Sequence, residues 1–206
     1  EDLPPLPEWM DCPIPKNAKL MKWNQQQTSG YEYKAKDSMK LYGPSIKYWG
    51  KDYEIPMKFY CYDEEGKKHG KFQIYTGRTG LLDEEGSYYH GVYDGVVKEY
   101  SGEHLIKLTT YKKGRKDGYA EEYIYNGENV GTLKQKGYYV DGSRDGEWES
   151  YDKEGKLRGT IVYTGATSHF IPIWLGLGFV VYGNVIKKWN VLHEDLFGRS
   201  YLITFC

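Results

Sequence analysis

Histidines, cysteines and carboxylates are the side chains of this chain that could bind a metal ion or move protons. The histidines are scattered, without the His-x-His, His-Glu-x-x-His or Cys-x-x-Cys spacing that brings metal ligands together. They are His69, His90, His104, His169 and His193. No candidate nucleophile is accompanied by a matched base. The sequence therefore predicts no enzyme, no metal site and no cofactor.

Three aspartates recur in front of glycines, at Asp94, Asp117 and Asp145. Lined up on one edge they could bind a cation, but Asp-Gly is typical of turns, because glycine accepts positive φ and Asp bonds nearby amides. His69 occupies the same slot, and we predict a turn role for it rather than ligation. The stretch "GLGFVVYG" (176–183) lacks the lysine and strand-to-helix context of a phosphate loop.

These aspartates belong to an internal repeat of the form Gly, two residues, Asp or His, Gly, four residues, Tyr. The four copies are "GKKHGKFQIY" (66–75), "GVYDGVVKEY" (91–100), "GRKDGYAEEY" (114–123) and "GSRDGEWESY" (142–151). Their second glycines, Gly70, Gly95, Gly118 and Gly146, follow one another at steps of 25, 23 and 28 residues. Such a period predicts a repeated structural unit.

Each repeat has the composition of a β-hairpin. The Gly-x-x-Asp-Gly segment predicts a turn, and the five residues after it alternate like a half-buried strand. A second glycine turn precedes a second strand, predicted at 105–111, 132–140 and 156–163. A lone β-hairpin is only marginally stable in water, so the hairpins must pair with one another. We predict an all-β fold, an elongated antiparallel meander over 31–165, with clear repeats over 58–165.

The pattern Y-x-x-G-x-x-D-G-x-x-x-x-Y, followed by an N-G or E-G-K turn, resembles the MORN-type repeats of the bacterial variant class, those of YwqK-like proteins. The resemblance covers about residues 58–165, roughly half of the chain. It implies a β-hairpin repeat fold and an interaction or scaffolding role, with no catalytic residues. Eukaryotic relatives of the repeat are linked to membrane lipids and to complex assembly.

Composition points to a protein partner. The 28 basic and 29 acidic residues nearly cancel, which argues against nucleic acid. The 22 tyrosines, against 6 phenylalanines, suit a half-exposed sheet face that binds another protein. The predicted contact residues are Tyr75, Tyr100, Tyr123, Trp148, Tyr151 and Trp174. The same rings could instead pack the hairpins together, and a lipid-binding or carbohydrate-binding surface is the alternative function.

The two flanks are not repeats. Residues 1–30 are proline-rich and predict an extended arm, lying on a neighbouring subunit, on its own sheet, or loose. The C-terminal part, 166–206, contains the apolar stretch 170–189. Its 17 uncharged residues from Phe170 to Ile186 would span about 25 Å as a helix, short of a bilayer core, and glycines interrupt them. We predict a β cap on the array, with membrane contact as the alternative.

Cysteines and the N-terminus bear on the compartment. Cys12 and Cys61 are either bridged, as an oxidising compartment allows, or idle thiols. Glu1 indicates either a removed signal segment or a fragment. We predict an accessory subunit of a larger complex in the cell envelope, exported or membrane-associated, with a cytoplasmic location as the alternative.

Overall fold

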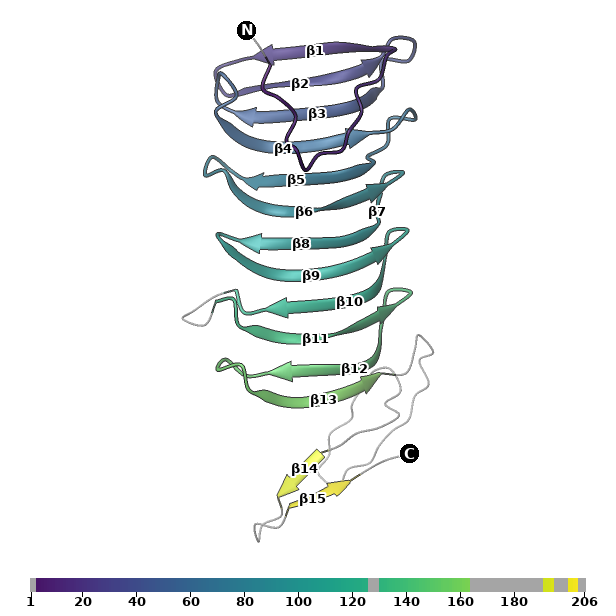
Figure 1. Ribbon diagram of the computed structural model, residues 1–206. Helices are drawn as coiled ribbons and strands as arrows, with labels where there is room; N and C mark the ends of the chain where they lie inside the picture. The colour runs from purple at the N-terminus through teal and green to yellow at the C-terminus, as the bar shows by residue number, and fades with distance from the viewer. Residues whose placement is uncertain (1–2, 126–129, 164–190, 195–199, 204–206) are drawn as a thin grey trace. The chain divides into compact units, whose positions relative to one another are not determined.

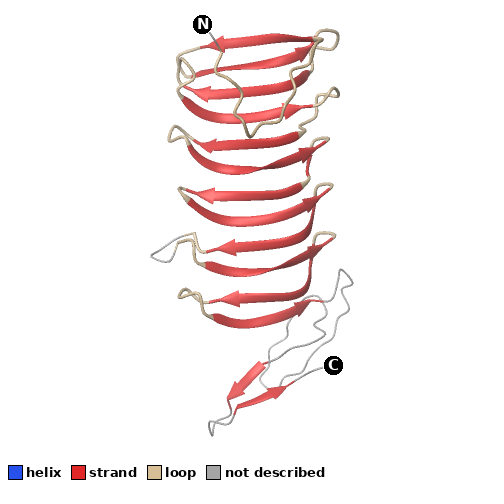
Figure 2. Ribbon diagram, in the orientation of Figure 1, coloured by secondary structure: helices blue, strands red, loops and turns tan. Residues whose placement is uncertain are grey.

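The computed structural model describes residues 3–125, 130–163, 191–194 and 200–203. Figure 2 shows strands and loops, and no helix, over these ranges. Thirteen strands form one open antiparallel sheet whose order follows the chain. The predicted all-β class and the meander of hairpins are therefore confirmed.

The large sheet takes up most of the described chain (Figure 1). Its strands are β1 (Ala18–Asn24), β2 (Thr28–Ala35), β3 (Leu41–Trp49), β4 (Ile55–Tyr62), β5 (Gly70–Thr76), β6 (Leu81–Tyr89), β7 (Val92–Tyr93), β8 (Gly95–Ser101), β9 (His104–Lys112), β10 (Arg115–Tyr123), β11 (Leu133–Val140), β12 (Ser143–Tyr151) and β13 (Leu157–Tyr163). The short strand β7 pairs with β6. A separate hairpin pairs β14 (Val191–Glu194) with β15 (Ser200–Ile203).

The chain divides into two compact units. The first comprises Glu1–Ile106 and Thr110–Gly114, and the second comprises Lys107–Thr109 and Arg115–Cys206. The predicted second strands of the repeats are present as β9, β11 and β13, each within one residue of the predicted bounds.

The hairpin turns are centred on the first motif glycine and the residue before it, and not on the whole Gly-x-x-Asp-Gly segment. In the second, third and fourth copies both of these residues have positive φ, which is typical of a type I′ turn. These pairs are His90–Gly91, Lys113–Gly114 and Asp141–Gly142, with φ values between 48° and 89°. The motif aspartate and second glycine lie within strands in the third and fourth copies. There Gly118 and Gly146 keep a positive φ, and the β11–β12 register shifts opposite Gly146.

The first unit buries side chains on both faces of its sheet. We call one the arm face; it carries a buried cluster of Tyr31, Ile46, Tyr48, Phe59 and Cys61, with Met10 and Cys12 packed on it. The opposite face carries a second cluster of Tyr60, Phe72 and Val97.

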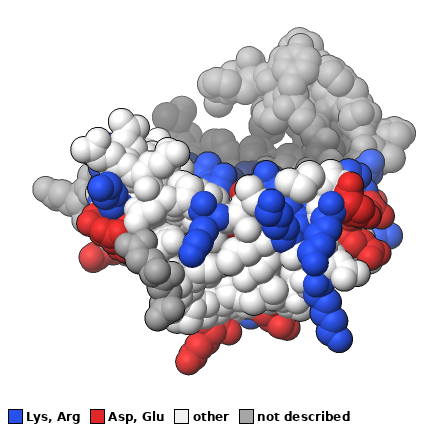
Figure 3. Space-filling view, turned by 90° about the horizontal axis from the view of Figure 1, so that it is seen from above, with Lys and Arg blue, Asp and Glu red and all other residues white. Residues whose placement is uncertain are grey.

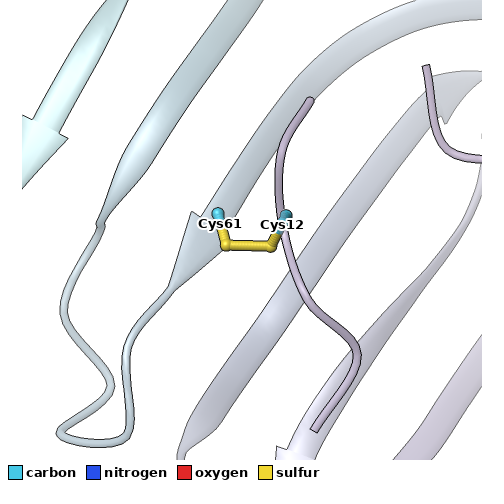
Figure 4. Close-up of a disulfide and its surroundings, with 2 residues drawn as sticks. All are labelled: Cys12 and Cys61. Carbon is cyan, nitrogen blue, oxygen red and sulfur yellow. A yellow bond between two sulfur atoms is a disulfide. The ribbon is translucent and has the colours of Figure 1, made fainter. Parts of the chain in front are cut away.

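The arm is shorter than predicted and lies on its own sheet. It covers residues 3–17, because the first strand, β1, begins at Ala18. Figure 1 shows this segment crossing the first strands. The hydroxyl of Tyr31 donates to the Pro4 carbonyl at 3.0 Å. A disulfide joins Cys12 to Cys61 of β4, with their Cα atoms 5.7 Å apart (Figure 4). Of the two alternatives for these cysteines, the structure has the bridge.

The second unit concentrates its burial on one face, the tryptophan face, where Ala120 and Trp148 are each 3% exposed. Gly137 lies against the indole of Trp148, and a Cβ atom there would collide with the ring. The other face, the carboxylate face, carries Glu121, Lys136 and Glu149 in cross-strand register.

The strand β1 forms an edge of the large sheet and carries exposed lysines at Lys19 and Lys22. Figure 3, seen from above, shows several Lys and Arg side chains standing out from the surface. Charged side chains on an edge strand discourage pairing with another chain.

The predicted C-terminal segment falls largely outside the described residues. This applies to the stretch 170–189, to Trp174 and to most of the cap predicted over 166–206. Within this part the structure describes only the β14–β15 hairpin. Among the described residues, no helix has the length and apolar character needed to cross a membrane.

Candidate functional site

The last tyrosine of each repeat makes a hydrogen bond through its hydroxyl. Tyr75 donates to Gln73 Oε1 at 2.5 Å and Tyr123 to Glu121 Oε2 at 2.5 Å. Tyr151 donates to Glu149, and Tyr100 donates to Glu85 Oε1 at 2.9 Å. These rings are half-buried and held in place, so they can present contact area at little entropic cost.

Glu85 is the centre of a polar ladder on the arm face of the first unit. Its carboxylate accepts from Gln73 Nε2 at 3.1 Å, from Lys98 Nζ at 3.1 Å and from the Tyr100 hydroxyl. Burial alone would raise the pKa of Glu85, but these donors outweigh it and lower the pKa below its ordinary value. Burial, together with the bond to this carboxylate, raises the pKa of Tyr100 to about 12.

A cleft of about 360 Å³ lies beside this ladder, within the first unit. The arm supplies Trp9, and the sheet supplies Lys71, Gln73, Lys98 and Val96 among other residues. The Trp9 ring stacks on Phe59 with a centroid distance of 6.3 Å. The cleft therefore joins an aromatic wall to cationic and amide side chains.

The carboxylate face of the second unit carries a corresponding ladder. Lys136 Nζ lies 3.2 Å from Glu149 Oε2, and Lys136 is also opposite Glu121 in the register. The Tyr119 hydroxyl donates to Glu121 Oε1 at 2.6 Å. Burial, followed by the bond to Glu121, raises the pKa of Tyr123 to about 12.

A second cleft, of about 590 Å³, lies within the second unit and brings together two of the predicted tyrosines, Tyr123 and Tyr151. Its lining also includes Tyr125, which is 63% exposed, and the cations Lys134 and Arg158. Residues of this kind bind polar ligands or polypeptide side chains by stacking and hydrogen bonding.

Trp148 does not belong to the exposed surface, which corrects its predicted role. It is 3% exposed, and its Nε1 donates to the Tyr138 carbonyl at 2.9 Å. The guanidinium of Arg144 lies 4.0 Å from its ring centroid. Trp148 is buried because of its place in the repeat, two residues after the second motif glycine. The residue at this place is buried in all four copies: Phe72, Val97, Ala120 and Trp148.

The other predicted residues differ in their surroundings. Tyr75 packs on the arm-face cluster, edge to face with Phe59 at 5.5 Å. Tyr100 joins the Glu85 ladder, and Trp174 lies outside the described residues. Sequence reasoning missed Trp9, although an aromatic residue within a proline-rich arm is a signal that could have indicated it.

The chain matches no family model, no curated protein and no solved structure. The resemblance to MORN-type repeats stays a prediction.

Proposed function

We propose that this chain is a non-enzymatic protein-binding module, an accessory subunit of a larger complex, which holds an extended segment of its partner on the arm face of the first unit. The observation that supports this proposal is the arm itself, an extended proline-rich segment seated on that face. Trp9 stacks on Phe59, and Tyr31 donates to the Pro4 carbonyl. Aromatic grooves bind proline-rich segments by the same combination of stacking and extended-chain recognition.

The cleft beside Trp9 offers room for a further segment. Val96 lines it and is 44% exposed, which provides an apolar contact. Lys71 supplies positive charge at its wall, where Lys98 is already paired with Glu85. We therefore expect the partner segment to carry an apolar side chain next to a carboxylate.

We also propose that the protein is located in the cell envelope, exported or membrane-associated, with the cytoplasm as the alternative. The Cys12–Cys61 disulfide supports it, because disulfides persist in oxidising compartments.

Site-specific photo-crosslinking in the native cells tests the proposal. A photoreactive amino acid at Val96 should yield a discrete crosslinked protein. The same group at Val92, which is 42% exposed and outside the cleft, serves as the matched control. Crosslinks of equal yield from both positions, or none from Val96, would contradict the proposal.

A carbohydrate-binding role is the second candidate, supported by the second unit. Its cleft places Tyr123, Tyr125 and Tyr151 beside Asp152 and Glu154, and aromatic rings next to carboxylates suit sugar recognition. Binding of a neutral oligosaccharide that is lost in Tyr125→Ala would favour it.

A membrane-surface role rests on residues 170–189, whose deletion should then release the protein from membranes.

A further inference from the structure

Three potential metal ligands meet at one corner of the first unit. Asp63 follows β4, His69 precedes β5, and His90 lies in the turn after β6. Each offers one ligand atom, and the three atoms all lie within 4.8 Å of one another. Within the described ranges, no other group of three histidine, cysteine or acidic side chains gathers in this way.

Asp63 is held in place by its own turn. Its Oδ1 accepts the backbone N–H groups of Glu65, at 3.1 Å, and Lys67, at 2.9 Å. This leaves Oδ2 to face His90, whose Nδ1 lies 2.8 Å away. The side chain of Asp63 is 11% exposed and that of His90 is 45% exposed. One carboxylate oxygen is thus fixed and presented to an imidazole that solvent can reach.

His69 supplies an independent observation. Its Nδ1 atom is buried and has no hydrogen-bond partner among the described residues. A buried polar atom without a partner costs about 1–3 kcal/mol, and a bound ion would offset this cost. The ring of His69 lies 5.3 Å from that of His90 and 5.2 Å from that of Tyr89, between centroids. Tyr89 shields the imidazole on one side.

The second copy of the repeat fills the same two positions differently. In the second copy, Asp94 occupies the slot of His69, and its Oδ1 accepts the N–H of Lys113 at 2.9 Å. Lys113 is the turn residue that corresponds to His90, with φ of 50° against 48°. In the first copy both positions are histidine, and the resulting pair cannot make that carboxylate-to-amide bond.

We propose that Asp63, His69 and His90 form a binding site for a zinc-class divalent ion, with an open coordination position on the solvent side of His90. Two imidazole nitrogens and one carboxylate oxygen are donors that suit zinc and its neighbours, whereas magnesium and calcium prefer sites made of oxygen. To bind the ion the three donors, which lie within 4.8 Å of one another, must draw closer, and the exposed side chain of His90 has room to move. The ion would tie the turn after β4 to the turn after β6. His69 then has a role beyond the turn that the sequence predicted for it.

Calorimetric titration with Zn²⁺ tests the site in the full chain. The protein is first treated with a chelator, its disulfide is kept oxidised, and Cys206 is blocked with N-ethylmaleimide so that no thiolate competes. We expect one Zn²⁺ per chain and a rise in the thermal unfolding midpoint at saturation, because the ion binds the folded state. Co²⁺ should give the visible absorption bands of a site with nitrogen and oxygen ligands. Absence of one-to-one Zn²⁺ binding, or equal binding of Mg²⁺, would overturn the proposal.

Variants locate the ion. His90→Asn keeps a residue that tolerates positive φ and should weaken Zn²⁺ binding more than about tenfold, since loss of even an outer hydrogen-bond partner has that effect. His69→Asn should do the same. His104→Asn, which removes an exposed histidine elsewhere, is the matched control and should bind as the parent does. Unchanged Zn²⁺ affinity in His90→Asn would refute the assignment, and the Co²⁺ spectrum of the unaltered chain decides the matter if a variant fails to fold.

Discussion

The two units cover the faces of an antiparallel sheet in different ways. In the first unit the arm lies on one face, and the residues beneath it are apolar, such as Ile46 and Phe59. In the second unit the carboxylate face carries Glu121, Lys136 and Glu149, and burial is concentrated on the tryptophan face. A sheet face left to solvent selects alternating polar side chains. The comparison teaches that a short covering segment allows an antiparallel sheet of hairpins to bury side chains on both faces instead of one.

The largest effect should come from the core of the second unit. We expect Trp148→Ala to destabilise that unit by about 3–5 kcal/mol, because its tryptophan face has little else to bury. Urea unfolding followed by circular dichroism measures the loss. Trp148→Phe keeps an aromatic ring but removes the Nε1 donor to the Tyr138 carbonyl, so it should lose less. Equal losses in the two variants would show that the hydrogen bond, not the packing, dominates.

The next largest effect should come from the arm of the first unit. Reduction of the Cys12–Cys61 bridge, which closes a loop with a sequence separation of 49, should cost about 2–4 kcal/mol. It should also increase the solvent exposure of Trp9, measured by quenching of tryptophan fluorescence. The double variant Cys12→Ser, Cys61→Ser reproduces the reduced state without a thiol reagent. Unchanged stability in that variant would mean that the arm packs without its covalent link, and that the first unit does not need it.

The smallest effect concerns the ladder around Glu85. The pKa of Glu85 is lowered in the folded state, so its contribution to stability is present above its ordinary value of 4.5 and is lost as the pH falls through the lowered pKa. The stability of Glu85→Gln should therefore fall less steeply than that of the parent below about pH 4.5. Glu103→Gln, at an exposed turn position outside the ladder, serves as the control. Parallel pH profiles for Glu85→Gln and the parent would show that the ladder adds no pH-dependent stability.

Much of the repeat could be predicted from the sequence because its signals are local. Glycine positions and strand alternation specified the hairpins, and β9, β11 and β13 lie where they were expected. Two prolines lie in interior strands, Pro44 in β3 and Pro56 in β4. The register shifts close to both residues, and a strand tolerates a residue without an N–H group at such irregularities.

The repeat also contains a packing signal, at its third residue, from which no prediction was made. The third motif residue lies against aromatic rings in all four copies. Lys68 lies over Tyr60, Tyr93 packs on Tyr88, Lys116 lies over Tyr139, and Arg144 lies over Trp148. A cation or an aromatic residue at this position is visible in the sequence. Its partner ring comes from another strand in the first three copies and from the same strand, β12, in the fourth.

The sequence by itself determined the hairpins and their antiparallel order, because turns and alternation act over a few residues. Only the tertiary structure decided that Trp148 is buried while Tyr123 and Tyr151 share a cleft. It also decided that the arm lies on its own sheet, and that Asp63, His69 and His90 meet. Those outcomes depend on which face a side chain takes and which distant strand lies beside it. Such long-range pairings leave no mark within a single repeat.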